Sequence, residues 1–248
     1  MHRNVLENYL NQLLEISRFE DYCPNGLQVE GRENIQQIIT GATASRALLE
    51  AAVIKRADTV LVHHGYFWRG EDARITGMKA RRLEMLITNK INLFAYHLPL
   101  DYHCVFGNNA QLAKKLEFVE TGRFGGQDIV AHGELVTPMP LSTLGEKILR
   151  VLEREPLVIG NPEQTIRRIA WCSGAAQGYF EAAIAQDVDA YLTGEISEQT
   201  VHAARESGVA LIAAGHHATE RYGVQALGDH LSEKFAIQHH FIDIDNPV

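Results

Sequence analysis

Three polar clusters in this chain each follow a short apolar run. They are His63 with His64, His97 with Asp101, and His216 with Glu220. In α/β proteins, ligands gather at the carboxyl ends of strands, which is where such clusters would lie. Imidazole and carboxylate groups together suit zinc, iron, manganese or nickel rather than a thiolate-type site. Three clusters in one chain therefore predict a metal centre that holds more than one ion.

The first cluster consists of two adjacent histidines. In an extended strand, the side chains of His63 and His64 would point to opposite faces. At a strand end the backbone turns, and Gly65 permits an unusual turn. The two imidazoles would then bind two different ions or flank one. The alternative is one buried, hydrogen-bonded histidine beside one surface histidine, but the neighbouring clusters favour metal binding.

The second cluster lies in the segment His97-Leu-Pro-Leu-Asp101. Pro99 disfavours a helix interior, so we expect Asp101 in a rigid loop after a strand. The alternative for Asp101 is a helix-capping or turn aspartate. His97 either binds a metal directly or orients a ligand or a bound water, and both interpretations remain open.

The third cluster is Gly215-His-His-Ala-Thr-Glu220. His216 and Glu220 share one face if a helix begins here, whereas His217 would point elsewhere. Glu220 has the reach to bridge two ions, although an acid in a first turn also interacts favourably with the helix dipole. Glu195, in Thr193-Gly-Glu195, is expected to line the site as a general base or as a partner of a ligand. The alternative for Glu195 is an acid at a helix N-terminus.

Apolar runs alternate with amphipathic segments along the chain, which predicts an α/β fold built from βαβ units with parallel strands. Strands are expected near 37–42, 59–62, 91–96, 129–136, 168–172, 189–193, 209–214 and 237–244. Helices are expected near 4–16, 45–56, 79–89, 108–117, 141–154, 176–186, 197–207 and 219–234.

A weak internal repeat indicates a duplicated architecture. Glu50-Ala-Ala-Val and Glu181-Ala-Ala-Ile each precede an apolar run, followed by His63-His64 in one half and Gly194-Glu195 in the other. Each half then continues to a further strand and a His-x-x-x-acid segment. We therefore predict two related α/β lobes, with the last strand able to pack back on the first lobe. The predicted lobes are residues 1–125 and residues 126–248.

Composition excludes several classes of protein. The chain is 46% hydrophobic and 22% charged, which is typical of a globular protein. No apolar stretch approaches the roughly 18 residues of a membrane span, and the first residues lack the apolar core of a signal peptide. We therefore expect a cytoplasmic protein. The three cysteines have no C-x-x-C spacing and are expected to be buried or semi-buried free thiols.

The net charge of −8 argues against a broad nucleic-acid interface. Local basic patches remain at 79–82 and 167–168, for which solvated helix or turn faces are the favoured interpretation. The small-residue turns at 43–45 and 173–176 could receive an anion at a helix N-terminus. Neither turn carries a Walker or Rossmann fingerprint.

Six motifs, in this order, resemble the GTP cyclohydrolase 1 type 2 homolog family. They are Asn25–Gly31, His63–Trp68, His97–Asp101, Gly107–Asn109, Thr193–Glu195 and Gly215–Glu220. The likeness runs from near Glu20 to the C-terminus and is closest to the short bacterial, YbgI-like members. Many relatives carry proline where this chain has Gly65, and longer relatives carry a middle insertion that this chain lacks.

The resemblance implies two interlinked α/β lobes with a dinuclear metal site in the cleft between them. It also implies a toroidal homohexamer whose metal sites face an internal cavity. The family's metal ligands map onto His63, His64, Asp101, His216 and Glu220, with His97 nearby. The expected cofactors are two divalent ions per chain, of iron, zinc, manganese or nickel. The implied activity is that of a metal-dependent hydrolase, such as a GTP cyclohydrolase, acting on an unknown small molecule.

Two other functions are compatible with the same residues. A non-enzymatic metal-binding or metal-delivery protein would release its metal readily to weak chelators. A ring-shaped module that binds nucleic acid or protein would shift labelled DNA in a salt-dependent way, if nucleic acid were its partner. Because the two halves each supply ligands for one centre, the hydrolase is the favoured hypothesis.

Overall fold

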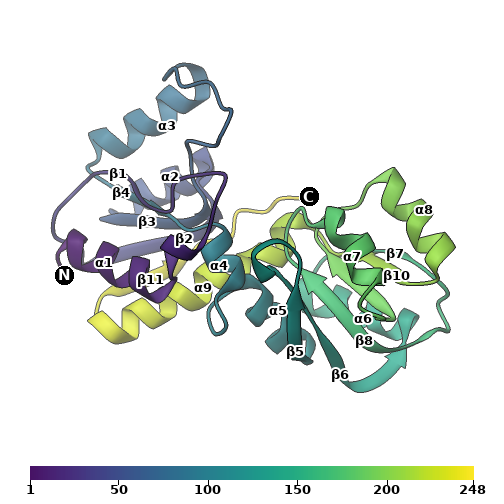
Figure 1. Cartoon of the computed structure of the whole chain (residues 1–248). Helices are drawn as coiled ribbons and strands as arrows, with labels where there is room; N and C mark the ends of the chain where they lie inside the picture. The colour runs from purple at the N-terminus through teal and green to yellow at the C-terminus, as the bar shows by residue number, and fades with distance from the viewer. The chain divides into compact units, whose positions relative to one another are not determined.

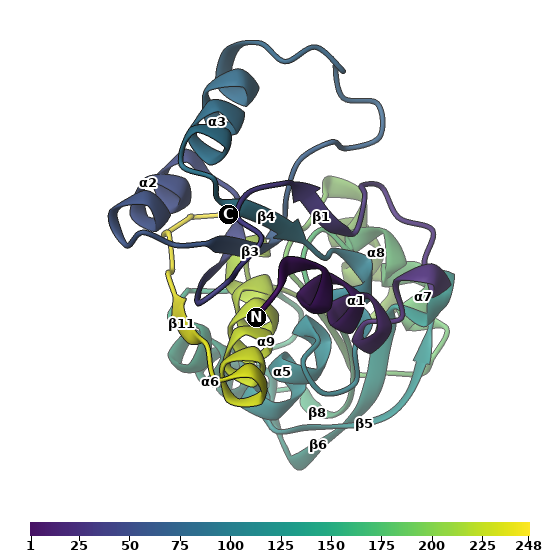
Figure 2. The ribbon, with the colours of Figure 1, turned by 90° about the vertical axis from the view of Figure 1, so that its left-hand side faces the viewer.

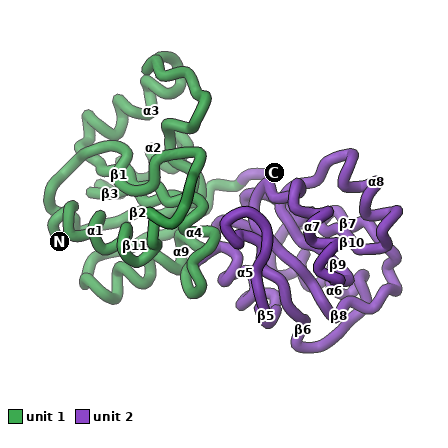
Figure 3. Tube along the Cα trace, in the orientation of Figure 1, with its two compact units in different colours: residues 1–106, 223–245 green, residues 107–222, 246–248 purple.

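The computed structural model describes all residues 1–248 and contains two compact units (Figure 3). Unit 1 comprises residues 1–106 and 223–245, and unit 2 comprises residues 107–222 and 246–248. Each unit has its own β-sheet with helices packed on it, so the predicted α/β class with two lobes is confirmed. The chain enters unit 2 before the boundary expected after residue 125, and it returns to unit 1 through its last helix and strand.

The sheet of unit 1 has five strands in the order β1-β4-β3-β2-β11. Their bounds are Gly26–Val29 (β1), Gln37–Thr43 (β2), Thr59–His64 (β3), Asn92–Ala95 (β4) and Gln238–Phe241 (β11). The strands β4, β3, β2 and β11 are parallel neighbours, whereas β1 pairs antiparallel with β4. A parallel sheet is buried on both faces, which explains why its central strands are continuously apolar.

Helices cover both faces of this sheet (Figures 1 and 2). They are α1 (Arg3–Leu13), α2 (Arg46–Ile54), α3 (Gly77–Thr88), the short α4 (Leu98–Tyr102) and the later turns of α9 (His216–Phe235). Side chains alternate along β3, so Val60 and Val62 pack in the core beneath α2 and α3. Leu61, between them, packs with α1 and α9 on the opposite face.

The sheet of unit 2 has six strands in the order β5-β6-β8-β9-β10-β7. Their bounds are Phe118–Phe124 (β5), Val130–Pro140 (β6), Leu157–Ile159 (β7), Thr165–Cys172 (β8), Ala190–Thr193 (β9) and Ala210–Ala213 (β10). The strands β8, β9 and β10 are parallel. The strands β5 and β6 extend the sheet antiparallel on one side, and β7 pairs antiparallel with β10 on the other.

Four helices and the start of α9 pack on the second sheet. The helices are α5 (Asn108–Leu116), α6 (Leu141–Leu152), α7 (Phe180–Ile184) and α8 (Glu198–Ser207), and short 3-10 turns lie at Ile16–Arg18, Gly126–Asp128 and Gln177–Tyr179. Trp171 belongs to the core that α5, α6 and the first turns of α9 cover. Tyr191 meets Phe180 of α7, with ring centroids 6.0 Å apart. No helix in the structure has both the length and the apolar character needed to cross a membrane.

The two sheets share one arrangement, as the internal repeat predicts. Each contains three successive parallel strands separated by helices, β2-α2-β3-α3-β4 in unit 1 and β8-α7-β9-α8-β10 in unit 2. In each, an antiparallel strand lies beside the third of these, β1 beside β4 and β7 beside β10. The polar clusters follow the second and third strands in both units.

The loop expected around Pro99 is instead the short helix α4. Pro99 is the second residue of this helix, where its missing N–H would have had no intrahelical acceptor. The prediction of a loop was therefore wrong, because the constraint that proline places on a helix interior does not apply to a first turn.

Candidate metal centre

In unit 1, four predicted ligands lie at the carboxyl ends of two neighbouring strands. The strand β3 ends in His63, which is buried, and His64, which is half-buried. His97 is the N-cap of α4 just after β4, and Asp101 lies within α4 at 5% exposure. Because β3 and β4 are adjacent and parallel, their ends lie at one edge of the sheet and bring these side chains together.

The three imidazoles are close enough to share an ion. Their ring centroids are 4.5 Å apart for His63 and His64, 5.0 Å for His63 and His97, and 5.7 Å for His64 and His97. One nitrogen from each ring lies within 4.8 Å of the other two. The Nε2 atom of His63 is 3.5 Å from Oδ1 of Asp101. Unit 1 thus brings together all four candidate ligands that the sequence places in it.

Gly65 is required here by space rather than by an unusual backbone turn. Its φ is not among the positive values of the chain, contrary to the sequence-based expectation. A Cβ atom at this position would overlap the side-chain amide of Gln28 and lie 2.6 Å from Cβ of Ala95. The glycine therefore lets the segment after the two histidines pack closely against β1 and β4.

The imidazoles of His63, His64 and His97 are each held at the Nδ1 atom. The partners are the carbonyl of Tyr96 for His63 at 2.9 Å, the hydroxyl of Thr43 for His64 at 3.1 Å, and Oδ1 of Asp21 for His97 at 2.7 Å. A carbonyl and an ionised carboxylate only accept, so Nδ1 carries the proton in His63 and His97. The Nε2 atoms of His63 and His97 then carry no proton and could donate to a metal ion, as ligating histidines usually do.

Asp21 is a residue of this site that the sequence analysis missed. Its carboxylate accepts hydrogen bonds from Nδ1 of His97, the backbone N–H groups of Tyr22 and Leu98, and the amide of Asn25. Burial raises the pKa of Asp21, but the hydrogen bond and charge of His97 and the other donors outweigh it, so the pKa is lowered. Asp21 therefore stays ionised and orients His97.

In the metal-free protein, Cys23 carries no thiolate. Cys23 lies with Asp21 and His97 in a group whose ligand atoms are within 4.8 Å of one another. Burial, together with the charge of Asp21, raises the pKa of the Cys23 thiol to about 12, so it stays protonated without a metal. Cys23 and Cys172 are buried as expected, whereas Cys104 is exposed, so the expectation of burial was wrong for Cys104.

In unit 2, His216 and Glu220 lie one turn apart in the first turns of α9, which begins at His216. Nε2 of His216 is 2.9 Å from Oε2 of Glu220, so the predicted shared helix face is confirmed. Glu195 follows β9, the parallel neighbour of β10, and its Oε1 is 2.7 Å from Nδ1 of His216. Glu195 thus holds His216 as Asp21 holds His97.

The electrostatics of His216 favour a bound cation. Burial lowers the pKa of His216, but hydrogen bonds and charges from Glu220 and Glu195 outweigh it and raise the pKa to about 9. Without a metal, His216 is therefore protonated at neutral pH, with its Nε2 atom 2.9 Å from Oε2 of Glu220. A metal ion that binds this nitrogen must displace that proton.

The turn at 173–176 packs around Glu220. Gly174 has φ +67°, and a Cβ atom there would overlap Oε1 of Glu220. Its carbonyl accepts hydrogen bonds from the hydroxyl of Thr193 and the N–H of Gly194. Asn109 of the Gly107–Asn109 motif anchors the same turn, because its Oδ1 accepts from the N–H of Ser173 at 2.9 Å. The residues of these motifs therefore fix the turn that packs against the carboxylate of Glu220.

The donor set of both units fits divalent cations. Unit 1 supplies three imidazoles and unit 2 supplies one, and each unit supplies a carboxylate that is at least 95% buried, Asp101 in unit 1 and Glu220 in unit 2. Each unit also contains an imidazole–carboxylate pair in which the acid holds Nδ1. Nitrogen and oxygen donors of this kind suit zinc, iron, manganese or nickel.

Comparisons with known proteins agree over the full length of the chain. The model of the Duf34/NIF3 (NGG1p interacting factor 3) family matches residues 1–247. A Pseudomonas aeruginosa protein named GTP cyclohydrolase 1 type 2 homolog is 58% identical, covering 99% of this chain and 98% of its own. A Yersinia pestis protein of the same name is 53% identical, covering 99% and 100%.

Solved structures are similar throughout. That of protein ybgI, described as of unknown function, has a TM-score of 0.97 and 49% identity and covers 100% of both chains. A protein of Thermus thermophilus has a TM-score of 0.92 and 32% identity, again with 100% of both chains covered.

Proposed function

The chain belongs to the Duf34/NIF3 family, and we propose that it binds two divalent metal ions and catalyses a hydrolytic reaction. The observation that carries the proposal is the fixed orientation of the imidazoles. Three rings in unit 1 and one in unit 2 are held at Nδ1 by groups of the chain, beside buried carboxylates. Burying such a set of polar side chains lowers the stability of the fold. A purely structural role would not require imidazoles oriented in this way.

The proposed ligands come from both units. They are His63, His64, His97 and Asp101 in unit 1, and His216 and Glu220 in unit 2. Bound divalent ions supply a water of lowered pKa and stabilise negative charge that develops on a substrate oxygen. Asp21 and Glu195 orient His97 and His216. Glu195 is half-buried, so it is also placed to accept a proton from a reacting group.

The substrate is proposed as a small molecule with a hydrolysable bond, with GTP and phosphate esters as the first probes. GTP is among the first probes because relatives carry the name GTP cyclohydrolase 1 type 2 homolog. We further propose a toroidal homohexamer, as the resemblance implies. Sedimentation velocity measures the mass of the protein in solution, and a monomer would contradict the proposed hexamer.

Metal content per chain tests the proposal first. Untagged protein is analysed by elemental mass spectrometry beside Glu220→Ala and the control Glu206→Ala, an exposed acid of α8. About two ions per chain are expected in the wild type and the control, with fewer in Glu220→Ala. No metal in any of the three, even after reconstitution, would refute the metal centre.

Activity is tested on the metal-loaded protein with GTP and a panel of phosphate esters. We expect the wild type to hydrolyse a compound of this panel and Asp101→Asn to lose that activity. Turnover equal to that of buffer with the same ions would refute hydrolysis of these substrates. Rapid loss of the metal to a weak chelator would then favour a metal-delivery protein, because a catalytic site usually retains its ion.

A further inference from the structure

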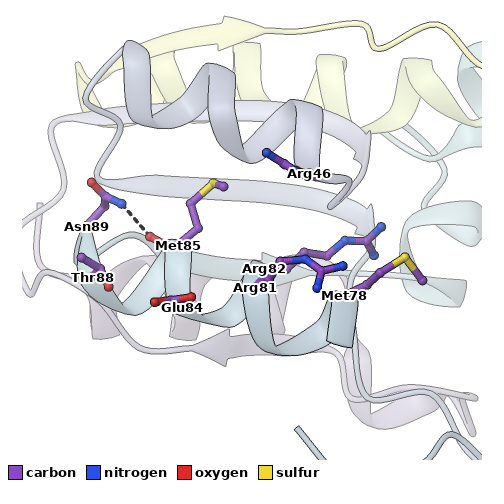
Figure 4. Close-up of a pocket in the computed structure, with 8 residues that line it drawn as sticks. All are labelled: Arg46, Met78, Arg81, Arg82, Glu84, Met85, Thr88 and Asn89. Carbon is purple, nitrogen blue, oxygen red and sulfur yellow. Dashed lines mark hydrogen bonds between the residues drawn. The ribbon is translucent and has the colours of Figure 1, made fainter. Parts of the chain in front are cut away.

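A second candidate binding site lies in unit 1, in a pocket of about 540 Å³ beside α2 and α3 (Figure 4). Its lining residues are Arg46, the first residue of α2, together with Met78, Arg81, Arg82, Glu84, Met85, Thr88 and Asn89. The volume falls in the range of about 300–1,000 Å³ of small-molecule sites. None of the proposed metal ligands lines the pocket.

Positive charge exceeds negative charge in this pocket. Its lining has three arginines and one acid, Glu84, in a chain whose net charge is −8. Arg46 pairs with Glu50 at 2.7 Å. Arg81 and Arg82 form no ion pair, whereas Arg3, Arg32 and Arg74 of the same unit each contact an acid at 2.7 Å. Two guanidinium groups on adjacent residues of α3 are therefore available for an anion.

Arg82 is held in place by an aromatic ring rather than by an acid. Its guanidinium lies 6.0 Å from the centroid of Tyr66, a buried residue whose hydroxyl donates to the carbonyl of Ala44 at 2.7 Å. Ala44 precedes Ser45, the N-cap of α2, so this contact links Arg82 to the corner where α2 begins. The contact leaves the N–H groups of Arg82 for a ligand, since a cation–π contact engages the face of the guanidinium.

The remaining lining suits a flat apolar body. Met85 is half-buried against the core under α2 and α3, and Met78 is 67% exposed. Thioether side chains make favourable contacts with aromatic rings. Thr88 and Asn89 lie at the end of the pocket away from Met78 (Figure 4). The amide nitrogen of Asn89 donates to the carbonyl of Met85 at 2.8 Å, which orients its side-chain oxygen as a further acceptor.

We propose that this pocket binds a phosphate monoester that carries a flat aromatic body, the chemistry of a nucleoside monophosphate. The phosphate contacts Arg81 and Arg82, with Arg46 beside it. The aromatic ring packs against Met85, and Thr88 and Asn89 bond to its polar edge. The basic segment 79–82, for which the sequence favours a solvated helix face, then has a binding role. This site is independent of the proposed metal centre.

Calorimetric titration with AMP, adenosine and inorganic phosphate tests the proposal, in buffer with EDTA so that bound metal contributes nothing. AMP is expected to bind at least about 10-fold more tightly than adenosine or phosphate alone, since each lacks one part of the recognition. The double variant Arg81→Gln/Arg82→Gln is expected to weaken AMP binding by at least about 10-fold. The control Arg167→Gln, an exposed arginine of β8 in unit 2, should bind as the wild type does.

Several results would overturn the proposal. They are no AMP binding up to about 5 mM, equal binding by the double variant and the wild type, and equal binding of phosphate and AMP. In a second titration, of metal-loaded protein without EDTA, binding that Asp101→Asn removes and the double variant keeps would place the phosphate at the proposed metal centre instead. A changed sedimentation coefficient in the double variant would mark the face as an interface between copies. If the double variant does not fold, Arg46→Gln is titrated in its place, with weaker AMP binding expected and unchanged binding contradicting the site.

Discussion

The apparent affinity of the proposed centre for a divalent ion should rise steeply between pH 7 and pH 9. Burial lowers the pKa of His216, but Glu220 and Glu195 outweigh it and raise the pKa to about 9. The ring must lose its proton before Nε2 can bind a metal. With this pKa, about one molecule in a hundred has a neutral His216 at pH 7. The affinity at pH 7 should therefore be about 100-fold below its limit above pH 9, a change of about 10-fold per pH unit.

Competition against a chromophoric zinc chelator of known pH dependence measures this slope at pH 7, 8 and 9. Calorimetry in two buffers of different ionisation enthalpy should show about one proton released per ion at pH 7. Glu195→Gln removes one charge that raises the pKa of His216, so its slope should be shallower. Glu198→Gln, an exposed acid of α8, should leave the slope unchanged. If the zinc affinity, after correction for the pH dependence of the chelator, changes by less than about 3-fold across this range, the assignment of the proton to His216 is refuted.

The same proton affects the stability of the metal-free protein. Because the pKa of His216 in the folded chain is raised from 6.5 to about 9, the protonated form contributes stability that is fully present below the unfolded pKa. That contribution is lost as pH rises through the folded pKa. Urea unfolding of the metal-free protein should therefore show a falling free energy of unfolding between pH 6.5 and pH 9, and a smaller fall in Glu195→Gln. A rise over this window would contradict the assignment.

Three further substitutions probe the residues that position the site and the fold. Asp21→Asn removes the charge that holds His97, so the zinc affinity measured by chelator competition should fall about 10–100-fold. An unchanged affinity would mean that Asp21 does not orient a ligand. Gly174→Ala places a methyl group on Glu220 at φ +67°, so the free energy of unfolding should fall by about 1–3 kcal/mol, and an unaltered urea midpoint would contradict the packing. Helix propensity alone would make Gly228→Ala in α9 about 1 kcal/mol more stable. However, the new Cβ atom would overlap Nε2 of His239, so we expect a lower melting temperature. A higher melting temperature would refute the contact.

The periodicity of the sequence predicted most of the elements, including the edge strand β11, and missed the other three edge strands. The central strands β2, β3, β4, β8, β9 and β10 are buried runs, and their pattern identified them before the structure. The strands β1, β5 and β7 were not predicted. They are short or largely exposed, with seven residues at most, and pair antiparallel beside stronger strands. Their β-conformation depends on those partners rather than on their own composition.

The sequence by itself determined which side chains can bind a metal and that they follow strands. His63, His64, His97 and His216 were recognisable because an apolar run before a polar cluster is a local pattern. Only the tertiary structure decided what holds each ring. Asp21 is 76 residues from His97 and Glu195 is 21 residues from His216 along the chain. Parallel pairing and the turns after each strand bring these groups together, and no periodicity of two or 3.6 residues encodes contacts over such separations.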